Sequence, residues 1–244
     1  FMEAMENLWI CLNVYAEEQL LPECLDSIKK AHPEAKIVAV DGAYDSWIRE
    51  VKKLIAHQIE YNHDQVAEQL ERFIVPISTD RTLEILKDYK VDVVIGPEIN
   101  PVTGEPTPWA HEYIKRSKYF VGTNGDWYFV IDADERLVGK LDVGALSDDA
   151  YNIDLLRDDQ MTPYPILRIF KHQDGMEYRG AHHALWVGDK LYRKEYCVKV
   201  TGCSLYHRAV HRNEVDPIRH LAKGAYYRIL TSNEEGAFRH QYGL

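Results

Sequence analysis

A stretch of thirteen residues, GDWYFVIDADERL at positions 125–137, constrains the fold more than any other part of the chain. Its apolar run from Trp127 to Ile131 is typical of a strand that is buried on both faces, as the strands of parallel sheets are. Three acids follow this run at once: Asp132, Asp134 and Glu135. Open α/β sheets bind ligands at the carboxyl ends of their strands, so we expect these acids to face a ligand.

The first part of the chain alternates strand and helix patterns. Residues 8–13 predict a strand, which is followed by a helix and then by a second strand ending at Asp41. The short links favour parallel strands joined by a right-handed crossover. From Trp47 the helical spacing resumes, breaks near Asp64 and continues to Phe73, which predicts a helical hairpin of about 25 residues with Asp64 as its second N-cap.

The next segments repeat the alternation. Ser78 or Thr79 is the expected cap of a further helix, and a strand is predicted over Val91 to Ile95. A loop rich in proline leads to a segment that is helical up to Phe120. After the acidic strand the pattern changes to short strand-like segments, which predict a mixed or antiparallel addition to the sheet, and residues 216–235 predict a final helix.

Composition limits the kinds of partner. The formal net charge is -10, which argues against general binding to nucleic acid backbones. The four cysteines form no C-x-x-C pair, and the beginning of the chain does not resemble a signal peptide, so we expect reduced thiols and a cytoplasmic protein. No window approaches the ~18 apolar residues of a membrane-spanning helix, so we expect no membrane span. The oligomeric state is not readable from the sequence.

The acidic cluster favours a metal site. Two carboxylates at positions i and i+2, on a strand end and its turn, can both reach one divalent cation, and hard oxygen ligands suit Mg²⁺ or Mn²⁺. Such a site normally needs phosphate oxygens to complete the metal's coordination. Asp132 and Asp134 therefore predict a ligand that carries phosphate. The alternative is a solvated turn in which Glu135 caps the next element.

Four segments together resemble family 2 glycosyltransferases, which have the GT-A fold: NVYAEEQLLPECLDSI, VAVDGAY, STDRTLEILKDY and GDWYFVIDADERL. The resemblance implies an α/β fold with a mixed, mostly parallel sheet flanked by helices. It implies a single domain over residues 1–244, with a nucleotide-sugar-binding half at 8–140 and an acceptor-binding half at 141–244. The family has no break between the second and third segments, so residues 45–77 are expected to be a helical insertion.

The resemblance also implies roles for individual residues. Asn13, Tyr15 and Glu17 would line the nucleotide pocket, and Asp41 would face the uracil or ribose, with Asp80 as a less secure addition. The remaining implied contacts are those of Arg116 with the phosphates, of Asp132 with the ribose and the metal shell, and of Asp134 with the metal itself. For Arg116 a solvated helix face remains the alternative, as does a plain turn for Asn13 and a helix N-cap for Asp41.

The second half supplies further metal ligands. The segment RIFKHQDGMEYRGAHHALW resembles a family pattern in which a histidine follows a glycine, and this places His182 or its neighbour His183 near the metal or diphosphate. His207, at the end of a predicted strand, is a second ligand expected from its position. His207 belongs to a locally basic group that suits the clamping of a diphosphate, with a surface turn as the alternative: Tyr206, His207, Arg208, His211 and Arg212.

An enzyme that inverts the sugar needs a general base near the acceptor hydroxyl. We expect Glu177 in this role and Asp159 as the second choice, while Asp158 and Asp174 stay open. Each of these acids could equally be a solvated loop residue. A retaining enzyme would require no base at this place.

These observations predict a metal-dependent glycosyltransferase that takes a sugar from a nucleotide-diphosphate donor, with a UDP-sugar as the expected donor and Mn²⁺ or Mg²⁺ as cofactor. The acceptor stays open among a glycan, a protein, a lipid-linked sugar and a modified nucleic-acid base. The main alternative is a non-catalytic domain that binds nucleotide or sugar. A nucleotidylyltransferase fits less well because NVYAEEQ lacks glycine, and a phosphatase fits less well because Glu135 and Arg136 follow the second aspartate.

Overall fold

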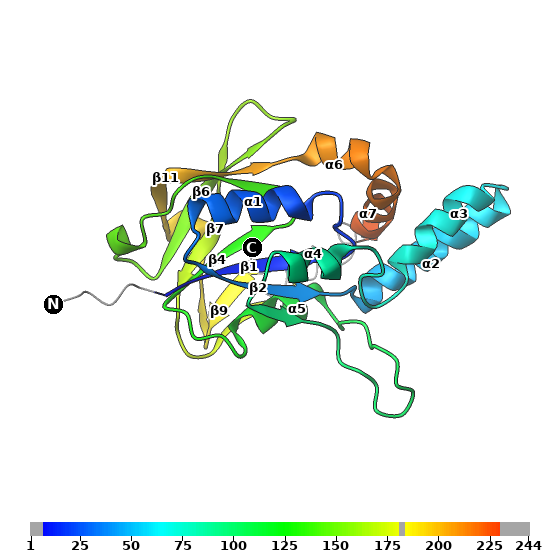
Figure 1. The fold of residues 1–244 in the computed structure, drawn as a ribbon, viewed down its shortest axis with the longest axis horizontal. Coiled ribbons are helices and arrows are strands. Elements are labelled where there is room, and N and C mark those ends of the chain that lie inside the picture. The colour runs from blue at the N-terminus through cyan, green and yellow to red at the C-terminus, as the bar shows by residue number, and fades with distance from the viewer. Residues whose placement is uncertain (1–6, 181–183, 230–244) are drawn as a thin grey trace.

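Eight strands form one mixed sheet in the order β3-β2-β1-β4-β7-β6-β11-β5, and three more form a small antiparallel sheet in the order β10-β9-β8 (Figure 1). The computed structural model describes residues 7–180 and 184–229. The strands of the large sheet are β1 (Leu8–Val14), β2 (Lys36–Asp41), β3 (Val93–Ile95), β4 (Trp127–Asp132), β5 (Glu135–Gly139), β6 (Ala150–Arg157), β7 (Tyr164–Lys171) and β11 (Val198–His207). Those of the small sheet are β8 (Met176–Arg179), β9 (Ala184–Val187) and β10 (Lys190–Leu191).

The helices follow the strands closely in the chain. They are α1 (Leu21–Ala31), α2 (Asp45–Glu60), α3 (Asp64–Leu70), α4 (Thr82–Asp88), α5 (Glu112–Ser117), α6 (Ala209–Val215) and α7 (Pro217–Ile229). Short 3₁₀ helices are η1 (Glu71–Phe73), η2 (Lys118–Phe120), η3 (Val143–Ala145) and η4 (Lys194–Tyr196). None of the helices described over residues 7–180 and 184–229 is both long enough and apolar enough to cross a membrane.

The large sheet has a parallel half and a mainly antiparallel half. Strands β3, β2, β1 and β4 are parallel neighbours, whereas β7 runs antiparallel to both β4 and β6. Beyond them β6 and β11 pair in parallel, and β5 closes the edge antiparallel to β11. The mixed, mostly parallel sheet expected from the sequence is therefore confirmed. One continuous sheet also joins the residues before position 140 to those after it.

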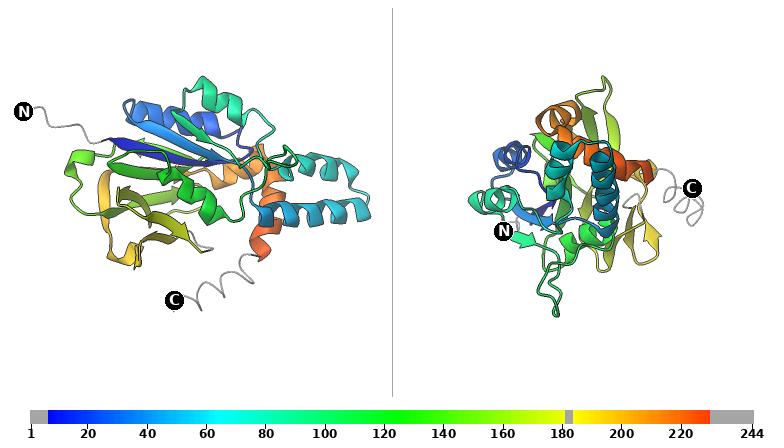
Figure 2. Two further views of the ribbon diagram at one scale, coloured as in Figure 1. Left: turned by 90° about the horizontal axis from the view of Figure 1, so that it is seen from below. Right: turned by 90° about the vertical axis from the view of Figure 1, so that its right-hand side faces the viewer.

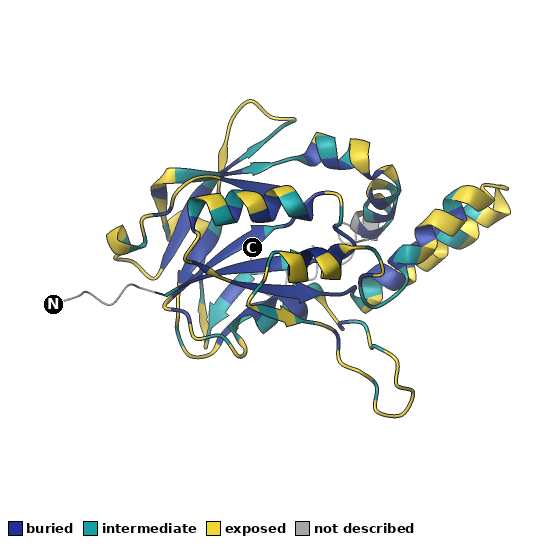
Figure 3. Cartoon of the chain, in the orientation of Figure 1, coloured by how far each residue is buried: buried dark blue, intermediate teal, exposed yellow. Residues whose placement is uncertain are grey.

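Both faces of the sheet are covered, as its strands require. One core cluster packs Leu25 and Ile28 of α1 and Leu86 of α4 against one face. A second cluster packs Tyr119 and the small sheet against the other face (Figure 2). The central strands are consequently buried on both sides (Figure 3), which explains their continuous apolar runs.

The predicted helical hairpin is present as α2 and α3, which project from the end of the sheet (Figure 1). Its base is held by an aromatic cluster in which Trp47 and Phe73 pack with Tyr226 of α7. One detail of the prediction is wrong. Asp64 is the first residue of α3 rather than its N-cap, a place where its charge still favours the positive end of the helix.

Local predictions around the third strand need correction. Neither Ser78 nor Thr79 caps α4, because the Thr82 N–H donates to Asp80 Oδ1 at 3.0 Å. The strand predicted from Val91 begins only at Val93. The turn after β2 requires Gly42, whose φ is 112° and whose added Cβ would lie 2.8 Å from the carbonyl oxygen of Pro76.

Candidate functional site

The polar ends of three parallel strands meet at one edge of the sheet. Pairing between β1 and β4 places Asn13 in register with Asp132, and pairing between β1 and β2 places Val14 in register with Asp41. The chain order of the strands reverses between β2-β1 and β4, so this edge is a topological switch point. Ligands of open α/β sheets bind in the crevice at such a point.

The loop after β1 is held rigidly by the segment that follows the hairpin. Three of its backbone N–H groups donate to side chains there: Ala16 N to Ser78 Oγ at 2.8 Å, Glu17 N to Thr82 Oγ1 at 2.7 Å, and Glu18 N to Asp80 Oδ2 at 3.2 Å. Asp41 is buried and accepts bonds from both the N–H and the hydroxyl of Ser78. Ala16 has a φ of 52°, a strained conformation that these contacts maintain.

Asp132 lies between two arginines. Its Oδ1 accepts from Arg116 Nη2 at 2.9 Å, and its Oδ2 accepts from Arg168 Nη2 at 2.8 Å. Arg168 stands where the pairing of β7 with β6 shifts register, and such bulges re-aim side chains. The same Nη2 also contacts Glu135 at 2.8 Å. Burial alone would raise the pKa of Asp132, but the two guanidinium groups outweigh it and lower the pKa below its usual range.

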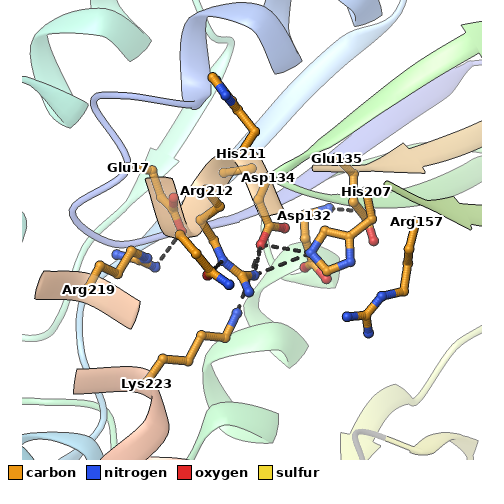
Figure 4. A network of polar contacts seen from close by, with 12 residues as sticks. Glu17, Asp132, Asp134, Glu135, Arg157, His207, His211, Arg212, Arg219 and Lys223 are labelled. Carbon is orange, nitrogen blue, oxygen red and sulfur yellow. Dashed lines mark hydrogen bonds and ion pairs between the residues drawn. The ribbon is translucent and has the colours of Figure 1, made fainter. Parts of the chain in front are cut away.

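Asp134 has partners of its own, contributed by the C-terminal elements (Figure 4). Pairing of β11 with β5 places His207 opposite Glu135, which brings His207 Nε2 to 3.1 Å from Asp134 Oδ2. Arg212 of α6 contacts the same oxygen, and Lys223 Nζ of α7 lies 3.9 Å from it. Burial opposes the charge of Asp134, but Lys223, His207 and Arg212 together hold its pKa well below the usual value. His211 points away from this group (Figure 4).

Between these groups lies a polar pocket of about 90 Å³. Asn13, Glu17, Asp132 and Asp134 form one wall, and α7 forms the facing wall. Two buried acceptor atoms of this wall, Asn13 Oδ1 and Glu17 Oε2, have no hydrogen-bond partner within residues 7–180 and 184–229. Because buried acceptors are nearly always satisfied in proteins, these two atoms point to donors from outside the described chain, such as a ligand or a bound water.

Helix α7 faces the pocket with residues spaced as one helix side requires: Arg219, Lys223 and Tyr226. Arg219 donates to the carbonyl oxygens of Tyr15 and Ala16 and to Glu17 Oε1. Burial raises the pKa of Glu17 to about 7, although Arg219 acts against this shift. This wall is not predicted from the sequence, although the spacing of its three residues is visible there.

A smaller pocket of about 40 Å³ adjoins the first, at the base of the hairpin. Tyr15, Tyr44 and Trp47 contribute aromatic rings to it. Lys115 is buried there, and its Nζ donates to the carbonyl oxygens of Val14 and Gly42 at 2.7 Å each. Burial lowers the pKa of Lys115 to about 7. Arg116, its neighbour, faces the larger pocket, so neither side chain belongs to a solvated helix face.

The residues present fit a divalent cation only in part. Within the described chain, His, Cys, Asp and Glu side chains form no group of three that could hold a metal ion. Asp134 and His207 approach each other closely enough to share one ion, whereas both oxygens of Asp132 are engaged by arginines. His182 lies outside the described residues. Mg²⁺ usually binds one or two carboxylates plus substrate phosphates, so Asp134 fits an ion that arrives with a diphosphate, and His207 would add a nitrogen ligand.

The acids considered as general bases lie elsewhere. Glu177 accepts from Arg179 Nε at 2.6 Å on the face of β8 opposite the buried Tyr178. Asp159 receives two bonds from Arg157, at 2.8 and 2.7 Å, and is exposed. Asp158 accepts from the Val210 N–H at the beginning of α6. The structure brings neither Glu177 nor Asp159 into the wall of the polar pocket.

Comparisons with known proteins give only weak likenesses. No protein-family model and no curated protein matches the chain. S. aureus TarS 1-349 aligns with 96% of this chain and 68% of its own, at 14% identity and a TM-score of 0.44. Its complex with UDP aligns with 65% of this chain at 18% identity and a TM-score of 0.38, so that the match spans 38% of that chain.

A third solved structure belongs to glucosyl-3-phosphoglycerate synthase from Mycobacterium tuberculosis, in complex with Mn²⁺, UDP and glucosyl-3-phosphoglycerate. It aligns with 54% of this chain and 34% of its own, at 13% identity and a TM-score of 0.32. Scores and identities this low carry no conclusion about activity.

Proposed function

We propose that this protein is a glycosyltransferase that transfers a sugar from a nucleotide-diphosphate donor, with a UDP-sugar as the expected donor. The observation that carries the proposal is the polar pocket at the switch point between β1 and β4. It combines Asp132 and Asp134 with several cations and with two buried acceptors that lack partners. The sequence resemblance to family 2 glycosyltransferases with the GT-A fold supports the same proposal.

The nucleoside would bind near the loop after β1. Asn13 Oδ1 and Glu17 Oε2 need hydrogen-bond donors, and ribose hydroxyls and base N–H groups are donors of this kind. Tyr44 and Trp47 line both pockets and offer aromatic faces for base stacking, which contributes about 1–3 kcal/mol per base. Asp41 acts here through Ser78, which fixes the backbone of Ala16.

The diphosphate would bind at the carboxylate pair. Asp134 and His207 would hold Mn²⁺ or Mg²⁺, which would neutralise the negative charge that develops on the leaving diphosphate. On binding, Arg212 and Lys223 would exchange their contacts with Asp134 for contacts with phosphate oxygens. Arg116 would stay on Asp132 and orient the carboxylate toward the ribose. The chain thus provides positively charged groups that are ready before the reaction begins.

Entry of the donor requires a movement of α7. A pocket of about 90 Å³ is smaller than the ~300–1,000 Å³ typical of ligand sites. Arg219 fills the space beside the carbonyl oxygens of Tyr15 and Ala16, where the nucleoside would bind. We therefore propose that donor binding displaces Arg219 and shifts α7 outward on the hairpin.

Thermal unfolding with Mn²⁺ and a panel of UDP, GDP, ADP, CMP and dTDP tests this proposal. A ligand that binds the folded state raises the midpoint, so one diphosphate should raise it only when metal is present. Asp134→Asn should abolish the shift, while Asp88→Asn, an exposed residue of α4, should retain it. A folded protein whose midpoint no nucleotide changes would refute the proposal.

Catalysis is tested separately by the release of UDP from UDP-sugars. Nucleotide binding without release from any UDP-sugar, alone or with added acceptors, would favour the alternative of a non-catalytic nucleotide- or sugar-binding domain. Release that depends on Asp134 would support the transferase.

A further inference from the structure

A third and larger cavity, of about 300 Å³, lies between β7 of the large sheet and the small sheet β8-β9-β10. Its walls are mostly apolar or aromatic, and Phe170, Tyr178, Leu185 and Tyr192 are among the residues that line it. Strand β7 and the elements after it provide most of this cavity, whereas the strand ends of the parallel half and α7 provide most of the polar pocket. The two spaces therefore belong to different parts of the fold.

The two spaces nevertheless meet. Arg116 and Asp132 line both the cavity and the polar pocket, and no other described residue lines both. The ion pair between them, 2.9 Å long, is thus the common wall. A molecule in the cavity and a molecule in the pocket would approach each other across this ion pair.

The cationic groups of the cavity have hydrogen-bond donors to spare. Arg168 is 8% exposed and makes its contacts to described residues through Nη2 alone, while its Nε is buried without a partner among them. A guanidinium carries five N–H groups, so most of those on Arg168 have no acceptor among the described residues. Lys194 stands exposed at the cavity, and its ammonium forms no ion pair within residues 7–180 and 184–229.

Charge alone does not select the ligand, because carboxylates already face both arginines. Asp132 and Glu135 pair with Arg168, and Glu112 pairs with Arg116 at 3.0 Å. These carboxylates accept hydrogen bonds from only some of the N–H groups of Arg116 and Arg168, and the remaining N–H groups have no acceptor among the described residues. The cavity therefore requires a ligand rich in acceptor oxygens, and Lys194 favours one that is anionic. The aromatic and aliphatic walls suit the apolar face of a sugar ring.

We propose that this cavity binds the acceptor of the transfer, and that the acceptor is a small sugar-like molecule bearing a phosphate or carboxylate group. This assignment of the cavity as the acceptor site rests on the proposed function. In the reaction, the acceptor hydroxyl oxygen forms a bond to C1 of the donor sugar as the bond from C1 to the diphosphate oxygen breaks. The electrons of that bond leave with the diphosphate, and the hydroxyl proton is released to water.

Binding of glucose 6-phosphate, glucuronate and glucose to the full chain tests the proposal, with isothermal titration calorimetry and no nucleotide present. We expect one or both anionic sugars to bind and glucose to bind at least about tenfold more weakly, since a charge-assisted hydrogen bond contributes that much. The two anions distinguish a phosphate-bearing from a carboxylate-bearing acceptor. Equal affinity for glucose and both anions, or no binding of any of them, would overturn the proposal.

Variants locate the binding. Lys194→Gln should weaken the anionic sugar by about tenfold without affecting stability, because its side chain is exposed. Lys30→Gln, an exposed lysine of α1, should leave the affinity unchanged. An anion whose affinity is the same in the Lys194 variant as in the unaltered protein binds elsewhere, and this result would also overturn the proposal. If inorganic phosphate binds as tightly as glucose 6-phosphate, the sugar ring contributes nothing to the affinity. The part of the proposal that makes the acceptor sugar-like would then fail.

The nucleotide experiment separates the two proposals. If UDP binds with metal and no anionic sugar binds, the acceptor proposal fails and the donor proposal stands. If an anionic sugar binds in a manner that depends on Lys194 while no nucleotide binds, the transferase proposal fails and the cavity remains a sugar-anion site.

Discussion

The parallel half of the sheet and the elements that follow it in the chain contribute mostly opposite charges to one site. The parallel half, before position 140, supplies the carboxylates of Glu17, Asp132 and Asp134. The elements after it supply most of the groups that neutralise them: Arg168, His207, Arg212, Arg219 and Lys223. Each half alone would bury unpaired charges, which is costly. The site therefore exists only where both halves meet, and each prediction below removes one side of this pairing.

The largest effect is expected from Arg168→Met. The variant would leave Asp132 with one arginine and Glu135 with none, both in a buried setting. Removing one partner of a buried pair typically costs about 3–5 kcal/mol, so urea unfolding should show a loss of this size. The matched control is Arg81→Met, which breaks an exposed pair with Glu84 and should cost far less. Equal losses of unfolding free energy in the two variants would contradict a stabilising role for the ion pairs of Arg168.

Asp134→Asn should come next. The substitution keeps the shape of the side chain but removes the charge that His207, Arg212 and Lys223 surround. We expect the release of UDP from a UDP-sugar to fall by about a hundredfold or more, the range seen when a key electrostatic group is lost. Circular dichroism should show an intact fold. A rate within twofold of the unaltered protein would show that Asp134 takes no part.

The pH dependence of the free energy of unfolding should reveal the raised pKa of Glu17. Its folded-state pKa, about 7, lies above the ordinary value of 4.5. The folded state therefore holds this proton more tightly, which stabilises the protein fully below pH ~4.5, and the contribution is lost as pH rises through about 7. Glu17→Gln should flatten the stability curve by about 2 kcal/mol between pH 5 and 7. Chemical denaturation at several pH values measures it, and parallel curves for the two proteins would contradict it.

The smallest effect is expected from Lys223→Gln. Lys223 is partly exposed and lies 3.9 Å from Asp134, so its contribution is screened by solvent. We expect the affinity for UDP with Mn²⁺ to weaken by about threefold, and the difference to shrink at high salt. An affinity that does not change at low salt would exclude Lys223 from the diphosphate site.

The parallel half of the sheet could be predicted from sequence patterns more completely than the site as a whole. Asp132 and Asp134 follow an apolar strand, and such a local pattern places them at the sheet edge. The hairpin was predictable for the same reason. Arg168 and Arg219 were not, because their carboxylate partners lie 36 and 202 residues away in the chain. A bulge in β7 and the docking of α7 decide those contacts, and neither has a local signature.

Two further misses have physical causes of the same kind. Ser78 was expected to cap a helix, but the buried Asp41, 37 residues earlier, binds its N–H and hydroxyl instead. Strand β5 was not predicted because Glu135 and Arg136 give it a polar beginning, yet both are buried against partners from other elements. Polar residues whose partners are distant in the chain mislead predictions from local sequence patterns. Such residues are concentrated at this site.

The docking of α7 also sets the time at which the polar pocket of a newly made chain is complete. Synthesis proceeds from the N-terminus, so β1, β4 and the hairpin are available long before α7 emerges from the ribosome. Until then the groove beside Glu17 stands open, without Arg219 over the carbonyl oxygens of Tyr15 and Ala16. A nascent chain would thus expose a negatively charged, unguarded pocket, and α7 would close it only after the parallel half has folded.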